Sequence, residues 1–213
     1  MKVMRFLLFI ILACCCPITF AENHSELKAL LSPISTLEAN FQQTLKNEQG
    51  RLLQQLSGKV ALKKPAQFRW EVLGKEARLV IADGEKIWDF DKDLEQITVQ
   101  NLDQGQNKAP IYFLTGEVEG LEKDFYIKKL VTRQGICLEG SDTCFELLPK
   151  VNEGSFQWIK IGFKAKVLKE MQMLDQLGQY AHFTFKNVRL NTNIPATYFR
   201  FSPPKHIDVL VNG

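Results

Sequence analysis

Apolar and polar residues alternate with a period of two along most of the chain. Val60 and Leu62 alternate with polar or small neighbours before a corner at Pro65. Phe68 and Trp70 alternate with charged residues directly after that corner. This alternation predicts two strands that each have one apolar face. Because proline cannot donate a hydrogen bond to a strand ladder, Pro65 marks a strand end, and we expect a hairpin around it.

The same pattern predicts strands on both sides of this hairpin. The expected strands cover residues 37–45, 54–63, 67–73, 76–82, 86–91, 95–100, 126–132, 145–148, 155–163, 167–174 and 179–186. Asp83-Gly84 predicts a tight turn between two of them. In the tail, we expect the prolines at 203 and 204 to end any ladder.

Short helical segments interrupt this meander. Ser25 is a candidate cap for a helix that Pro33 stops. An apolar insert at 109–114 begins with a proline suited to the first turn of a helix, and residues 117–125 predict another short helix. The sequence therefore predicts a mainly β protein with a few short helices.

The N-terminus has the features of a secretory signal. Lys2 and Arg5 precede an apolar stretch, and small residues end the segment at Ala21. We expect cleavage there, export to the periplasm, and a single domain over residues 22–213. An alternative start, in which Cys14 or a neighbouring cysteine is lipidated, stays open.

Two cysteines remain after the expected cleavage. Cys137 and Cys144 flank a short polar segment. In an oxidising compartment, this arrangement predicts a structural disulfide across a hairpin turn.

The charge pattern and the motifs argue against several classes of protein. The net charge is only +3, and the expected cleavage removes two positive charges, so we expect no nucleic-acid partner. No motif of a hydrolase, zinc enzyme or phosphate-binding loop is present, and we expect neither catalysis nor a cofactor. The three histidines are isolated, and the acids at 89, 91 and 93 fit a turn better than a calcium loop, so we expect no metal site.

A long antiparallel sheet that curls must fill its interior with side chains, a ligand or an inserted element. The apolar insert, through Pro110, Ile111, Phe113 and Leu114, is the candidate lid. The large apolar residues of the strands are candidates to line a hydrophobic cavity: Val60, Leu62, Phe68, Trp70, Leu79, Ile81, Trp88, Phe90, Ile97, Met171 and Met173. We expect Phe68 and Trp70 to line its mouth.

These features together resemble the LolA family of periplasmic outer-membrane lipoprotein carriers. The matching stretches are residues 37–44, 58–70, 79–90, the Ala109-Pro110 segment and 199–204. The resemblance implies an incomplete antiparallel β-barrel, or half-barrel, whose helical lid covers a cavity for lipoprotein acyl chains. The family often has arginine before the corner proline, where it holds the lid shut. Here Lys64 stands in that place, and we expect it to latch the lid through fewer hydrogen bonds.

The resemblance also implies partners. The expected protein is a monomer that takes lipoproteins from an ABC-type releasing complex in the inner membrane. It delivers them to a receptor lipoprotein on the outer membrane. Three alternatives stay open: a receptor lipoprotein of the same fold, a periplasmic lipid-binding sensor and a lipid-processing protein.

Overall fold

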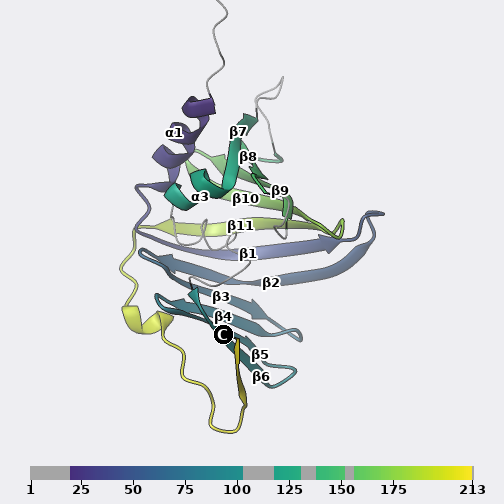
Figure 1. The fold of residues 1–213 in the computed structure, drawn as a ribbon, viewed down its shortest axis with the longest axis vertical. Helices are drawn as coiled ribbons and strands as arrows, with labels where there is room; N and C mark the ends of the chain where they lie inside the picture. Colours follow the sequence, from purple (N-terminus) through teal and green to yellow (C-terminus); the bar gives the residue numbers. More distant parts are fainter. Residues whose placement is uncertain (1–19, 103–117, 131–137, 152–155, 213) are drawn as a thin grey trace, which may run out of the picture.

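The computed structural model describes residues 20–102, 118–130, 138–151 and 156–212. Within these ranges two α-helices, α1 (Phe20–Leu31) and α3 (Val118–Asp124), lie on one large sheet, and a short 3-10 helix, η2 (Ala196–Phe199), lies in the C-terminal tail (Figure 1). The sheet consists of β1 (Thr36–Lys46), β2 (Leu52–Lys63), β3 (Gln67–Leu73), β4 (Arg78–Asp83), β5 (Lys86–Asp91), β6 (Gln96–Asn101), β7 (Phe125–Leu130), β8 (Thr143–Pro149), β9 (Phe156–Lys164), β10 (Val167–Asp175), β11 (Tyr180–Leu190) and β12 (Val209–Asn212).

The sheet is open. Its strand order is β12-β6-β5-β4-β3-β2-β1-β11-β10-β9-β8-β7, so β12 and β7 form its two edges. All neighbours are antiparallel except β12 and β6. The open, almost wholly antiparallel sheet confirms the predicted mainly β fold and its incomplete barrel.

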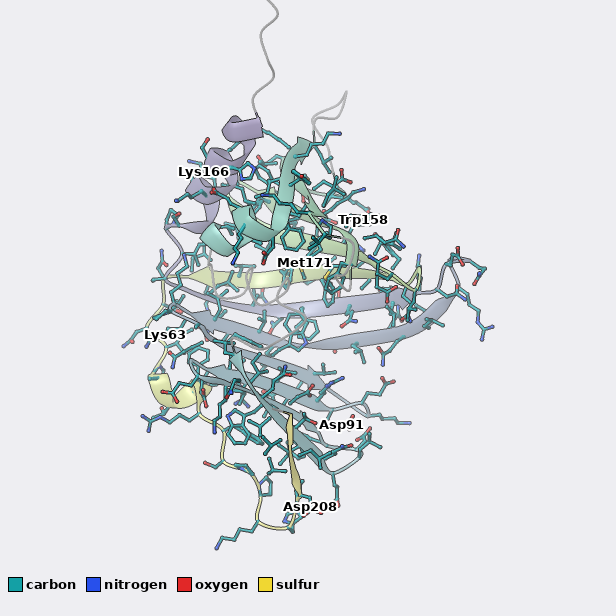
Figure 2. The ribbon with its side chains drawn as sticks, in the orientation of Figure 1. Lys63, Asp91, Trp158, Lys166, Met171 and Asp208 are labelled. Carbon is teal, nitrogen blue, oxygen red and sulfur yellow. The ribbon has the colours of Figure 1, made fainter. Side chains whose placement is uncertain are left out.

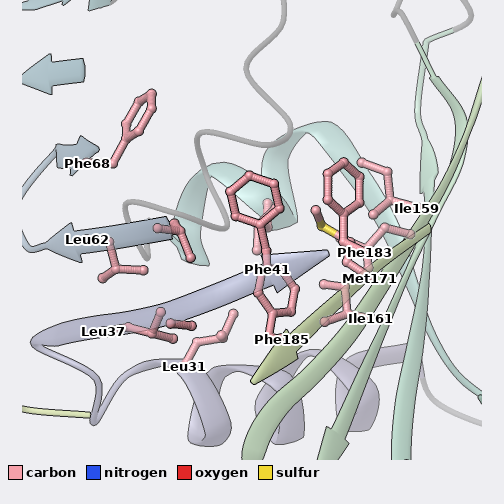
Figure 3. Packing of buried hydrophobic residues seen from close by; sticks show 14 of the residues in the cluster. Leu31, Leu37, Phe41, Leu62, Phe68, Ile159, Ile161, Met171, Phe183 and Phe185 are labelled. Atoms are coloured by element: carbon pink, nitrogen blue, oxygen red, sulfur yellow. The ribbon is translucent and has the colours of Figure 1, made fainter. Parts of the chain in front are cut away.

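Alternation gives the sheet two different faces. We call the face that carries Phe41, Val60 and Leu62 the inner face, because Leu27 and Leu31 of α1 and Leu121 of α3 belong to the same buried cluster. The opposite face is the outer face. Figure 3 shows side chains of several strands meeting on the inner face around Phe41.

The centre of the inner face depends on a close approach between strands. Phe41 stacks on Trp70 with ring centroids 4.0 Å apart, and Trp70 meets the ring of Phe183 edge-on at 5.6 Å. Gly58 lies opposite Phe41 in the register of β2 with β1. A Cβ atom at this position would lie 2.6 Å from the Phe41 ring and would also clash with the carbonyl oxygen of Glu71. Glycine therefore allows the aromatic stack to form.

The turn between β4 and β5 is held by one carboxylate. Asp83 Oδ1 accepts hydrogen bonds from the backbone N–H of Glu85 at 3.0 Å and of Lys86 at 2.8 Å, and its Oδ2 accepts one from Trp88 Nε1 at 3.0 Å. Partial burial alone would raise the pKa of Asp83, but these hydrogen bonds to the charged form lower it below its usual value. The predicted Asp83-Gly84 turn is confirmed, and Gly84 has a positive φ of 109°.

Two predictions about the ends of the chain are wrong. Helix α1 begins at Phe20, five residues before the expected cap at Ser25. The prolines at 203 and 204 do not end the ladder, because β12 pairs with β6 after them. This pairing is parallel, and residues 191–208 carry the chain from the end of β11 across the outer face to the edge at β6.

Other helical predictions have mixed outcomes. The predicted helix at 117–125 is confirmed by α3. The expected lid residues Pro110, Ile111, Phe113 and Leu114 lie outside the described residues, as does Cys137. Neither α1 nor α3, the α-helices of the described ranges, has the length and apolarity of a membrane span.

We predict that Gly58→Ala lowers the free energy of unfolding by about 2 kcal/mol, because the added methyl group displaces either the Phe41 ring or the Glu71 backbone. Urea denaturation followed by tryptophan fluorescence measures this change. Ser57→Ala is the matched control, since the neighbouring Ser57 is exposed. Equal stability of the Gly58→Ala variant and the wild type would contradict the close approach.

We predict that Asp83→Ala costs about 1 kcal/mol of stability at neutral pH. Since the folded-state pKa lies below the unfolded one, this contribution is present above the usual aspartate pKa and is lost as the pH falls through the folded-state value. Urea denaturation at neutral and acidic pH measures the difference. Glu85→Ala, in the same turn, is the control. A destabilisation that persists in acid would contradict this role.

Candidate functional site

An apolar cavity lies beneath the C-terminal end of α1. Its volume is about 40 Å³, and α1, the α1–β1 connection, β1, β2, the β2–β3 turn, β9, β10 and β11 contribute to its wall. The lining residues are Leu31, Ile34, Leu37, Val60, Leu62, Lys64, Ile161, Leu168, Met171 and Phe185. Nine of these ten side chains are apolar, so the cavity favours hydrocarbon over polar ligands.

Lys64 joins the wall of this cavity to α1. Its Nζ donates hydrogen bonds to the carbonyl oxygens of Leu31, at 2.9 Å, and Ser32, at 3.4 Å. These carbonyls lie at the C-terminal end of α1, where the backbone has unsatisfied acceptors and a partial negative charge. A cation is therefore favourable there. The contact ties the β2–β3 turn to the helix that covers the cavity.

The neighbouring lysine serves the other face of the sheet. Lys63 Nζ donates to the carbonyl oxygen of Ile194 at 2.8 Å. Ile194 belongs to a small buried cluster with Ala61 and Phe199. Lys63, at the end of β2, and Lys64, in the β2–β3 turn, thus fix the covering segments of the two faces separately.

The structure brings six of the expected cavity residues to the inner face. In the register, Val60 pairs with Trp70, Leu62 pairs with Phe68, and Met171 and Met173 lie on β10 opposite Ile161 and Ile159. Of the six, Val60, Leu62 and Met171 line the cavity itself. Phe68 is only 3% exposed and lies within the core rather than at a mouth.

The other five expected residues lie on the outer face, so the expectation of one shared lining is wrong. Arg69 alternates with Phe68 and Trp70 along β3, so its side chain points to the outer face. Ile81 pairs with Arg69 and Trp88 pairs with Ile81, so both lie on that outer face as well. Leu79, Phe90 and Ile97 share this outer face through the same register.

The tail of the chain explains why the outer face is apolar there. The ring of Phe201 lies 5.6 Å from that of Trp88 and 5.9 Å from that of Phe90. β4 is apolar on both faces because one face meets the core and the tail covers the other. Apolar runs of this kind do not reveal which face is inside.

Sequence reasoning missed several residues of the site. Phe41, Phe183 and Phe185 form the floor of the inner face, and Leu168 closes one side of the cavity. All four lie in predicted strands, within residues 37–45, 167–174 and 179–186. The missing information was the pairing of β1 with β11, which joins strands far apart in the sequence.

A buried polar cluster on the outer face has a structural role. Glu170 is 1% exposed, and it accepts a hydrogen bond from Ser141 Oγ at 2.9 Å while its second oxygen lies 2.9 Å from His182 Nε2. In hydrolases, the serine donates to the histidine that activates it. Here Ser141 binds the carboxylate instead, so the three groups satisfy one another without preparing a nucleophile.

Two other expectations concern cysteine and metal. Cys144 is disulfide-bonded, which fits the expected pair, although Cys137 is outside the described ranges. Within those ranges, no group of three or more histidine, cysteine, aspartate or glutamate side chains could hold a metal ion.

The sequence matches known proteins over most of its length. Residues 32–202 match the family model described as outer membrane lipoprotein carrier protein LolA. An outer-membrane lipoprotein carrier protein from Legionella pneumophila is 36% identical over 90% of this chain and 91% of its own length. A protein of the same name from Pseudomonas aeruginosa is 32% identical over 99% of both chains.

Comparison of folds adds a distant structural neighbour. An uncharacterized conserved protein from Thermus thermophilus matches with a TM-score of 0.53 and 13% sequence identity, over 90% of this chain and 98% of its own. At that identity the match supports the fold alone. The family match and the relatives at 32–36% identity carry the assignment, and the chain belongs to the LolA family of outer membrane lipoprotein carrier proteins.

Proposed function

We propose that this protein carries lipoproteins through the periplasm by holding their acyl chains against the inner face of the sheet. The observation that carries this proposal is the apolar cavity beneath α1, which is enclosed by a helix and strands and has lysine as its one charged wall residue. The names of the relatives, outer-membrane lipoprotein carrier proteins, support the same function.

The size of the cavity implies that its cover must move. Its volume of about 40 Å³ is far below the roughly 300 Å³ at the lower end of ligand pockets. An acyl chain therefore enters only when α1 shifts away from the strands. The floor is suited to such a change, because Met171 and Met173 are flexible side chains that repack around different shapes.

Lys64 controls this movement in our proposal. Its ammonium holds the end of α1 against the β2–β3 turn through hydrogen bonds to backbone carbonyls. Lysine offers three rotatable donors, whereas the arginine of other family members offers five in a rigid fork. The cover opens when the Lys64 ammonium and the carbonyls of α1 form hydrogen bonds to water instead of to each other. Because Lys64 is only partly buried, its charge stays hydrated during this exchange.

The partners follow from the proposed function. An ABC-type complex in the inner membrane supplies the lipoprotein and the energy, and a receptor lipoprotein on the outer membrane accepts it. The carrier acts as a monomer and performs no chemistry. Transfer proceeds towards the receptor because the receptor binds the acyl chains more tightly.

We predict that Leu168→Gln weakens binding of a fluorescent triacylated lipopeptide about tenfold, because an amide replaces part of the hydrocarbon wall. Leu168 is half-buried, so the variant keeps its fold. Leu174→Gln is the matched control, since Leu174 lies on the same strand but pairs with Trp158 on the outer face. Fluorescence titration measures both. Unchanged affinity of the Leu168→Gln variant would show that the cavity does not bind the acyl chains.

We predict that Lys64→Ala speeds hydrogen exchange of the amides at the C-terminal end of α1 about tenfold, since hydrogen bonds from a charged donor are lost. Lys64→Arg should restore slow exchange. Lys63→Ala is the control, because Lys63 binds Ile194 on the outer face. Mass spectrometry of deuterated peptides measures the rates. Identical protection in Lys64→Ala and wild type would show that Lys64 does not hold α1.

A further inference from the structure

Exposed leucines gather at one end of the strands. The hairpin turns β1–β2, β3–β4, β5–β6 and β10–β11 all lie at this end, on the right in Figure 1. Each of the four turns is flanked by, or contains, a leucine that is 46–79% exposed. We call this set the leucine rim; it consists of Leu52, Leu53, Leu73, Leu94 and Leu177.

The opposite end of the same strands differs. In the described part of the chain, the turns β2–β3, β4–β5 and β9–β10 carry no large exposed hydrophobic side chain. Figure 2 marks the two ends, with Asp91 on the side of the leucine rim and Lys63 and Lys166 on the opposite side. Of the seven exposed leucines in the described part of the chain, five belong to the rim, and Leu148 and Leu210 lie on β8 and β12. Single exposed leucines are common on protein surfaces, but such a concentration at one end of a sheet is not.

Three of the four turns are fixed by side chains. Asp175 Oδ1 accepts hydrogen bonds from the backbone N–H of Leu177, at 2.9 Å, and of Gln179, at 2.7 Å. Asp91 Oδ1 likewise accepts from the N–H of Leu94 at 3.0 Å. In the third turn, Asn47 Oδ1 accepts from the N–H of Arg51 at 2.8 Å, next to Leu52. Because these leucines lie on or next to ordered turns, their transfer into an apolar environment costs little further conformational entropy.

Neighbouring turns also support one another. The β10–β11 turn packs on the β1–β2 turn, since a Cβ added at Gly178 would lie 3.1 Å from Glu48 Cβ. The rim also continues into the apolar inner face, because Leu45, Leu56 and Met173, near these turns, pack against the core. Apolar surface therefore extends from the core to the tips of the hairpins.

The chemistry of the rim fits a lipid bilayer better than a protein partner. The rim presents five leucines along four hairpins, in or next to their turns, whereas protein interfaces depend on clustered tryptophan, tyrosine and arginine. Arg51, Lys75 and Lys92 lie within two residues of rim leucines and suit lipid phosphates. Acidic residues such as Glu76 and Asp93 offset them, so the apolar contact supplies most of the attraction.

We propose that the leucine rim is a membrane-contact surface, which inserts its leucines shallowly into the interface of a phospholipid bilayer. This site goes beyond the proposed carrier function and does not depend on it. Such shallow contact, with leucine side chains at the boundary of headgroups and acyl chains, is weak and reversible. It directs the hairpin end of the inner face towards the membrane.

Flotation with phospholipid vesicles tests this proposal. The cargo-free mature chain is mixed with vesicles of phosphatidylethanolamine and phosphatidylglycerol, and the bound fraction gives a partition coefficient. We expect the double variant Leu94→Ser/Leu177→Ser to lower it at least about tenfold. Both side chains are largely exposed, so the fold is retained, which circular dichroism checks. Val211→Ser is the matched control, because Val211 is 75% exposed but lies on β12, away from the rim.

The outcomes separate the alternatives. Wild-type binding that persists in high salt, with loss only in the double variant, supports insertion, since screening weakens charge contacts but not apolar ones. Binding that disappears in high salt, or equal binding of the wild type and the double variant, overturns the proposal. Unchanged vesicle binding with impaired cargo transfer in the double variant assigns the rim to a protein partner and also overturns it. None of these results depends on lipopeptide affinity, which tests the carrier function separately.

Discussion

The structure depends on one constraint: an open sheet has two faces, and the apolar parts of both must be covered. A closed barrel needs only one interior. Here the inner face is covered by α1 and α3, and part of the outer face by the C-terminal tail through Phe199 and Phe201. The two adjacent lysines of β2 and the β2–β3 turn fasten one cover each. The cover of the inner face is therefore anchored separately from that of the outer face, as the proposed movement of α1 requires.

Much of the fold follows from local patterns in the sequence. Strands β2 and β3, with their corner at Pro65, and the Asp83-Gly84 turn are determined by alternation and turn chemistry, which act within a few residues. The parallel pairing of β12 with β6 does not follow from such patterns, because it depends on a long connection over the outer face. The start of α1 was also missed, because residues 20 and 21 were assigned to the signal segment and Ser25 to the helix cap.

The candidate site was predicted only in part, for a related reason. Val60, Leu62 and Met171 were assigned to the cavity because their strands are polar on the other face. Trp88 and Phe90 were assigned to it wrongly, because their apolar character serves contact with Phe201. A period of two tells which residues share a face, but the direction of that face depends on what covers it. The resemblance singled out Lys64 as a latch for the segment at 110–114, which lies outside the described residues. The structure shows that Lys64 donates to backbone carbonyls at the C-terminal end of α1.

Photo-crosslinking can show whether acyl chains occupy the inner face beneath α1. A triacylated lipopeptide with a diazirine in one acyl chain is bound to the protein and irradiated, and the modified residues are identified by mass spectrometry. We expect crosslinks to inner-face residues around the cavity, such as Leu168, Met171 and Phe185. Crosslinks concentrated on Trp88 and Phe90 of the outer face would contradict this expectation.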